Sequence, residues 1–184
     1  MTSFGILLIY LSGVNIGSLT FEQKRAIFLI VFSGTFLLPL CLIPLLLLFR
    51  MVSSVHMNTL KERVLPLFFT LIVYLFTFRL MSGFLPGALY LFMTGVIISV
   101  GLVFAVSFFW KISAHMVGVG GLAGLLISLS FFFSVNLAAY IMLVLIAAGL
   151  LGFSRIELKA HSPSQVYTGF LSGTAVMIMV FYLS

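Results

Sequence analysis

The chain has 184 residues, of which 63% are apolar and only 7% are charged. This composition excludes an ordinary soluble domain and is typical of an integral membrane protein. The formal net charge is +6, but the basic residues stand singly between apolar runs and form no contiguous basic face. We therefore expect anionic lipid headgroups, and not nucleic acid, as their partners.

The first predicted element is a short apolar segment, Phe4 to Val14. Crossing a bilayer takes roughly 20 residues, so this segment is expected to be re-entrant or interfacial. Six longer apolar segments follow it. The predicted spans are Ala26 to Phe49, Val64 to Met81, Pro86 to Trp110, Met116 to Ser134, Leu137 to Phe153 and Pro163 to Leu183. The expected fold is an all-α integral membrane domain over residues 1–184, with a leader at 1–25 and a six-helix bundle at 26–184.

Tracing six spans back and forth across a membrane assigns each loop to one of two faces. One face receives nearly all the groups capable of chemistry: Arg50, His56, Lys61, Glu62, Arg63, Lys111, Ser113, His115, Ser154, Arg155, Glu157, Lys159 and His161. The other face receives Glu22, Lys24, Arg25 and Arg79. We expect the functional site on the first face.

Glycines four residues apart recur in two of the predicted spans. Gly120 and Gly124 form one pair, and Gly169 and Gly173 form the other. Each pair lies on one face of its helix, where the absence of side chains allows another helix to approach closely. This spacing predicts that another helix packs closely against each of these spans. Gly118, Gly120 and Gly121 are not expected to form a phosphate-binding loop, because no strand precedes them.

Several chemistries are excluded by residue content. The sequence contains no Asp, which excludes an Asp pair and most carboxylate metal cages. The single cysteine, Cys41, cannot form an internal disulfide, and no Cys or His residues show zinc-ligand spacing. No cofactor or metal is therefore expected.

Two polar clusters interrupt the last three spans on the same face. One is the run from Lys111 through Ser113 to His115, and the other is Ser154-Arg155 followed by His161 and Gln165. Each His opens a predicted span, where backbone N–H groups and the helix dipole favour an anion. The guanidinium of Arg155 fits phosphate oxygens. His161 and Gln165 are four residues apart and are expected to share a helix face. The pattern predicts a phosphate-handling site.

These residues resemble the type 2 phosphatidic-acid phosphatases, which share their site with the vanadium haloperoxidases. The second motif of that family reads P-S-G-H, and Ser113-Ala114-His115 is similar to it with Ala in place of Gly. The third motif reads S-R, five residues, H, three residues, D. Ser154-Arg155 and His161 match it at the same spacing. The resemblance covers the C-terminal half of the chain.

The resemblance implies a role for each matched residue. His161 would attack phosphorus and form a phosphohistidine, and His115 would protonate the leaving alkoxide. Arg155, Ser113 and the backbone N–H near Ala114 would hold the phosphate oxygens.

The sequence departs from the family at two motifs. Gln165 stands where the third motif has Asp, so it can accept the imidazole N–H but cannot compensate a positive charge. Only Glu62 or Glu157 could supply a carboxylate from elsewhere. The first motif, K, six residues, R-P, has a degenerate candidate in Lys61-Glu62-Arg63. We expect Arg63 as a second phosphate ligand, and Lys61 or Lys111 as the ammonium group.

The function expected from these observations is a metal-independent lipid phosphatase acting on a lipid phosphate or diphosphate. The alternative is a non-catalytic relative that binds or moves a phosphorylated lipid. A third reading is a structural membrane subunit without a ligand. Counting Lys and Arg places the site face in the cytoplasm, whereas the resemblance implies an outward site in the inner or plasma membrane. We favour the outer face, because phosphate-binding cations bias the count.

Overall fold

The computed structural model describes residues 1–14, 19–49, 51 and 60–184, and the side chains of 60–62 are outside the described set. Every regular element in the described ranges is a helix. Six helical segments are long and apolar enough to cross a membrane. The predicted all-α architecture is therefore confirmed.

The elements run along the chain in a simple succession of helices. They are α1 (Thr2–Leu11), α2 (Phe21–Phe32), η1 (Ser33–Leu37), α3 (Leu38–Leu48), α4 (Leu60–Met81), α5 (Gly87–Val106), α6 (Ala114–Phe132), α7 (Ala138–Glu157) and α8 (Pro163–Tyr182). The first span comprises α2, η1 and α3, and η1 is a π-helical turn.

Some ends of the predicted spans are wrong. The first span begins at Phe21 and not at Ala26, because Thr20 and Gln23 form a capping box that starts the helix. Residues 21–25 thus belong to α2 and not to a leader. α5 ends at Val106, before the predicted end at Trp110. In contrast, α7 continues through Glu157 and includes Ser154 and Arg155 in its last turn.

The short helix α1 packs inside the bundle. It contacts α2, α5 and α6, and the side chains of Ile6 and Ile9 are fully buried. The opposite face of α1 is exposed, at Phe4, Leu7 and Leu11.

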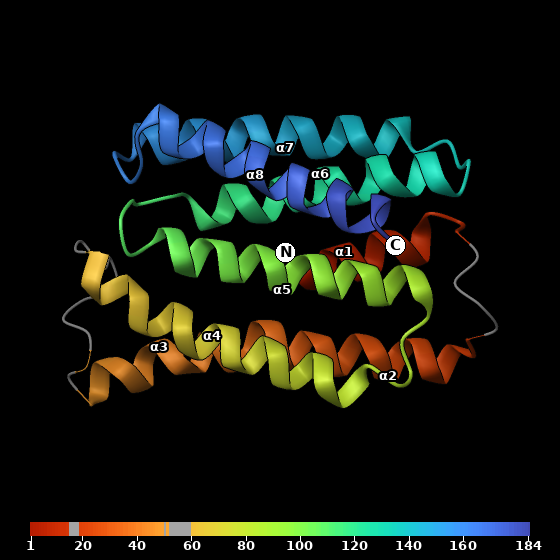
Figure 1. The fold of residues 1–184 in the computed structure, drawn as a ribbon, viewed down its shortest axis with the longest axis horizontal. Helices are drawn as coiled ribbons and strands as arrows, with labels where there is room; N and C mark the ends of the chain where they lie inside the picture. Colours follow the sequence, from red (N-terminus) through yellow and green to blue (C-terminus); the bar gives the residue numbers. More distant parts are fainter. Residues whose placement is uncertain (15–18, 50, 52–59) are drawn as a thin grey trace.

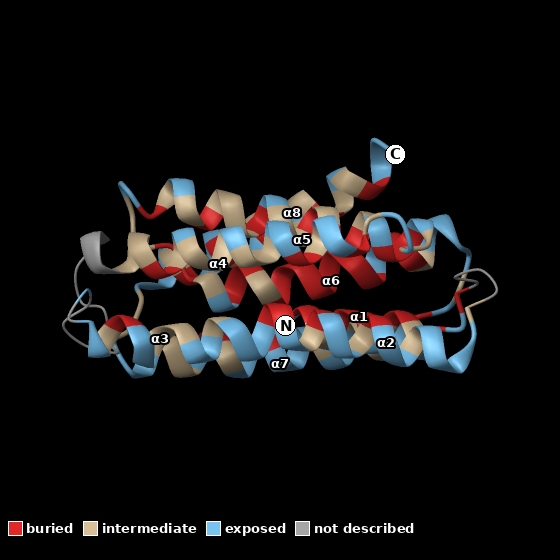
Figure 2. Ribbon diagram, turned by 90° about the horizontal axis from the view of Figure 1, so that it is seen from below, coloured by how far each residue is buried: buried red, intermediate tan, exposed pale blue. Residues whose placement is uncertain are grey.

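Helix α6 is the central helix of the bundle, and its buried positions extend around its whole circumference (Figure 2). It packs closely against α8. A Cβ on Gly124 would lie 2.6 Å from a carbonyl oxygen of α8, and one on Gly169 would lie 2.9 Å from the carbonyl oxygen of Ser113. Gly120 and Gly173 also face backbone of the opposite helix. Each glycine pair therefore admits a closely packed helix, as predicted, and the structure shows that α6 and α8 are each other's neighbour.

The helix ends gather at the two ends of the bundle as the tracing predicts. The starts of α4, α6 and α8 and the ends of α5 and α7 lie at one end (Figure 1). The start of α2 and the end of α4, with Arg79, lie at the other. Arg50 and His56, which the sequence assigns to the first end, lie outside the described residues.

Candidate functional site

The two polar clusters meet because α6 and α8 pack together. The backbone N–H of Ser113, just before α6, donates to the carbonyl oxygen of Gln165 in the first turn of α8 (3.4 Å). Gly169, one turn further along α8, allows the approach, because its missing side chain leaves room for Ser113 and Met116. The glycine pattern therefore positions the candidate site.

The chain leaves α7 through a turn that explains the five-residue spacing between Arg155 and His161. Lys159 has a left-handed conformation with φ 51°, and its N–H donates to the carbonyl oxygen of Ile156 (2.9 Å). The N–H groups of Ala160 and His161 donate to the carbonyl oxygen of Arg155 (3.1 and 3.2 Å). This is a Schellman-type helix end. It folds His161 back over the last turn of α7, next to Arg155.

A capping box then starts α8. The Oγ of Ser162 accepts the N–H of Gln165 (3.4 Å), and the Oε1 of Gln165 accepts the N–H of Ser162 (3.1 Å). His161 therefore lies just outside α8. The expectation that His161 opens the helix and shares a helix face with Gln165 is wrong, and the two side chains meet through the cap instead.

The imidazole of His161 is held in one tautomer by two carbonyl oxygens. Its Nδ1 lies 3.1 Å from the backbone oxygen of Lys111 and 3.2 Å from Oε1 of Gln165. A carbonyl oxygen only accepts hydrogen bonds, so Nδ1 must carry the proton. The lone pair is then on Nε2, which is the state that a nucleophile needs. The sequence indicates the Gln165 contact but not that of Lys111, because no side-chain pattern reports a backbone acceptor.

Burial sets the protonation state of His161. It lowers the pKa of the imidazole below its ordinary value of 6.5, and the positive charges of Arg63 and Lys111 lower the pKa further. The two hydrogen bonds to carbonyl oxygens oppose this shift. Because the net direction is downward, the imidazole is mainly neutral at pH 7.

Two arginines complete the cationic side of the site. Nη2 of Arg63, in the first part of α4, donates to the backbone oxygen of Ile112 (3.1 Å). Nη1 of Arg63 and Nε of Arg155 are buried and have no hydrogen-bond partner within the described residues. Buried guanidinium N–H groups without partners are costly. Each of these donors would be satisfied by an anion bound next to it.

The N-terminus of α6 contributes further donors. Ser113 is the N-cap residue, but its hydroxyl does not cap the helix. Its fully buried Oγ also has no partner among the described atoms. The first hydrogen bond of the helix runs from Val117 N–H to Ser113 O (3.0 Å), so the amides of Ala114 and His115 are free of it. The hydroxyl of Ser113 and these two amides are therefore suited to binding an anion.

His115 occupies the second position of α6 and is exposed. It lies within electrostatic range of Arg155, His161 and Arg63. It also lines a cavity of about 460 Å³ inside the bundle. The charges of Arg155 and Arg63 therefore act on His115 at this end of the bundle.

The remaining candidates are less central. Lys111 lies within electrostatic range of His161, so both its charge and its backbone oxygen act at the site. The side chains of Lys61 and Glu62 lie outside the described residues. Glu157 is exposed, and among the described side chains no carboxylate hydrogen-bonds to His161.

Fold and site together define a multi-pass helical membrane protein with a histidine and arginine cluster at one end of its bundle. Within the described residues, no three His, Cys, Asp or Glu side chains gather in a way that could hold a metal ion. Comparison with protein families, with curated proteins and with solved structures finds no match for this chain.

Proposed function

We propose that this protein is an integral-membrane lipid phosphatase that acts through a phosphohistidine on His161. The observation that carries the proposal is the pair of carbonyl acceptors on Nδ1, which leaves Nε2 unprotonated. Arg155 and Arg63 have buried guanidinium donors without a partner among the described residues, and such donors suit phosphate oxygens. The resemblance to the type 2 phosphatidic-acid phosphatases, in the residues from Ser113 to His161, supports the same assignment.

The reaction proceeds in two balanced steps. Nε2 of His161 forms a bond to phosphorus while the bond from phosphorus to the leaving lipid oxygen breaks. His115 transfers its proton to that oxygen, which leaves as the alcohol, or as the monophosphate when the substrate is a diphosphate. Water then attacks the phosphohistidine, His115 takes its proton, and inorganic phosphate departs.

The cationic groups act on the charge of the phosphoryl group. Arg155, Arg63 and the free amides at the start of α6 face oxygens that carry negative charge throughout the transfer. Donors already in place need no reorganisation during the reaction. The hydroxyl of Ser113 adds a donor without a competing partner in the described structure.

The test is phosphate release by purified full-length protein in detergent, with chelator, from a panel of lipid monophosphates and diphosphates. His161→Ala is expected to lower turnover at least about a thousandfold, because it removes the nucleophile. Lys159→Ala, on the same turn but exposed, is the matched control and should retain activity. Equal turnover in wild type and His161→Ala would refute the assignment.

One observation favours a second candidate function, the binding or movement of a phosphorylated lipid without hydrolysis. Gln165 provides a neutral acceptor where a phosphatase of the resembled family has a carboxylate. A neutral acceptor fixes the tautomer but does not stabilise the cationic imidazole that follows phosphoryl transfer. Labelled lipid phosphate and an alkaline denaturing quench separate the candidates. Phosphate on the wild-type chain, absent from His161→Ala, supports the phosphatase; saturable binding without it supports the binder.

A further inference from the structure

The cavity that begins at His115 runs from the candidate phosphate site into the interior of the bundle. Along α4 it is lined by Leu67, Thr70 and Tyr74, which follow Arg63 at spacings of four, three and four residues. These positions share one helix face. The cavity lining on α4 runs from Leu67 to Tyr74, a rise of about 10 Å along the helix. It begins one helical turn beyond Arg63, which is not among the residues that line it.

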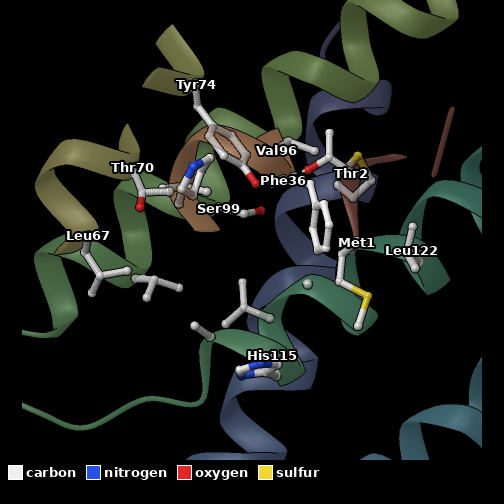
Figure 3. Close-up of a pocket in the computed structure, with 18 of the residues that line it drawn as sticks. Met1, Thr2, Phe36, Leu67, Thr70, Tyr74, Val96, Ser99, His115 and Leu122 are labelled. Carbon is white, nitrogen blue, oxygen red and sulfur yellow. Dashed lines mark hydrogen bonds between the residues drawn. The ribbon is translucent and has the colours of Figure 1, made fainter. Parts of the chain in front are cut away.

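The two ends of this cavity differ in character. His115 lies at one end, and Tyr74, Thr2 and Phe36 lie at the other (Figure 3). The hydroxyl of Tyr74 donates to the backbone oxygen of Thr35 in the π-helical turn (3.0 Å) and accepts from Thr2 (3.4 Å). These contacts use up the polar groups of the inner end. The walls between the ends are mostly apolar, contributed by α4, α5 and α6.

Ser99 is the exception on the apolar wall. It lies on α5, lines the cavity and is 92% buried (relative exposure 8%). Thr70, which also lines the cavity, donates to the carbonyl oxygen of Pro66 four residues earlier (2.7 Å). The Oγ of Ser99 has no hydrogen-bond partner among the described residues. Ser107, Ser113 and Ser128 also have buried hydroxyls without a partner among the described residues, but of these serines only Ser99 lines this cavity. A buried hydroxyl facing a cavity without a partner is costly unless a ligand satisfies it.

We propose that this cavity binds one chain of the lipid substrate, and that Ser99 donates a hydrogen bond to an oxygen on that chain. The occupant is an acyl chain attached to a phosphate-bearing headgroup. Its phosphate lies among Arg63, Arg155 and His115, and its hydrocarbon fills the apolar walls. Ser99 then selects chains that carry a carbonyl over alkyl or isoprenyl chains. This assignment rests on the proposed phosphate site, but it concerns binding and not turnover.

Size and charge favour this occupant. A volume of about 460 Å³ falls within the range of roughly 300–1,000 Å³ typical of small-molecule sites. The cations at one end attract the phosphate, and the α-amino group of Met1, a residue that also lines the cavity, adds a positive charge within electrostatic range of His115. Thr2 of α1 lines the cavity at the end opposite His115.

The test compares two lipids that differ only in one carbonyl, a 1-acylglycerol phosphate and its 1-alkyl ether analogue with the same chain. Binding is measured by calorimetry in detergent with full-length His161→Ala protein, which prevents turnover. We expect the protein to prefer the acyl lipid, and Ser99→Ala to reduce that preference by about tenfold, the effect of one hydrogen bond. Thermal stability without ligand should not fall, because no protein contact of the hydroxyl is lost.

A second, independent test places a larger side chain in the cavity. Val96→Phe adds bulk to the cavity wall, whereas Ile98→Phe adds similar bulk on the exposed side of the same helix. Val96→Phe is expected to weaken binding of dodecyl and octadecyl lipids more than of octyl ones, and Ile98→Phe should change neither. Equal effects of the two variants, or an unchanged acyl preference in Ser99→Ala, would overturn the proposal.

These outcomes separate the cavity from the catalytic proposal. Chain-dependent binding that responds to Val96→Phe, with no phosphate release by the protein with native His161, supports the chain cavity and counts against the phosphatase. Phosphate release that is insensitive to both Ser99→Ala and Val96→Phe supports the phosphatase and counts against the cavity. If the cavity holds only water, phosphate release should be insensitive to both substitutions.

Discussion

The protonation of His161 depends on the side chain that accepts its Nδ1–H. Gln165→Glu keeps the side-chain length and the capping box, since Glu also serves at this position, but adds a negative charge 3.2 Å from Nδ1 in the native geometry. A carboxylate there favours the imidazolium and raises the pKa of His161. The acid limb of the pH–rate profile should therefore shift to higher pH, as measured by initial rates of phosphate release.

The direction of this pH shift follows from the protonation state that the proposed nucleophile needs. In the wild type, burial lowers the pKa of His161 below its ordinary value of 6.5. The neutral imidazole that the proposed mechanism needs therefore persists down to that lower pH, and we expect activity to decline below it. Gln165→Leu is the matched control, because it removes the acceptor without adding charge. It should lower kcat and should not move the acid limb upward. An unchanged limb in Gln165→Glu would show that His161 does not govern the rate.

The residue types and their spacing predict the candidate site, but they do not predict most of its hydrogen bonds. The spacing of Ser154, Arg155 and His161 predicted a shared location, and the structure brings Arg155, His161 and His115 into electrostatic range. The backbone oxygen of Lys111 could not be predicted, since any residue supplies one. The left-handed backbone conformation of Lys159 could not be predicted either, because glycine is the usual signal for such a helix end.

At the scale of elements, the contact between α6 and α8 controls the site. Gly124→Ala would place a Cβ 2.6 Å from the carbonyl oxygen of Thr174, so the helices must separate. We expect a loss of about 1–3 kcal/mol in stability, seen as a lower unfolding temperature in detergent. Gly149→Ala on α7 meets no atom within 4 Å, and should be neutral or stabilising by up to about 1 kcal/mol. Equal effects of the two substitutions would contradict the packing.

The number and order of the helices follow from hydropathy alone, because each apolar run must satisfy its backbone inside the membrane. The positions of the helix ends do not follow from hydropathy, since they depend on local hydrogen bonds. The capping boxes at Thr20 and Ser162 are short polar signals that a hydropathy reading passes over. The last turn of α7 contains Arg155 and Glu157, so composition places its end too early. Each misplaced end lies within a few residues of the true one.

At the scale of the whole molecule, the site end and the opposite end must face different compartments. Basic residues occur at both ends, so charge counting alone does not decide the orientation. The proposed phosphate site uses Arg63, Arg155, Lys61 and Lys111, and cations that serve a ligand are left out of the count. Arg50 and Lys159 then remain at the site end, against Lys24, Arg25 and Arg79 at the opposite end. We therefore expect the site end to face outward.

Single-cysteine labelling measures this orientation. In a Cys41→Ser background, Leu158→Cys places a thiol at an exposed position of the site end, and Glu22→Cys places one at the opposite end. A membrane-impermeant maleimide applied to intact cells should label Leu158→Cys and leave Glu22→Cys unlabelled until the membrane is permeabilised. The reverse pattern would put the cationic cluster in the cytoplasm, where only lipids of the inner leaflet could reach His115 and the cavity behind it.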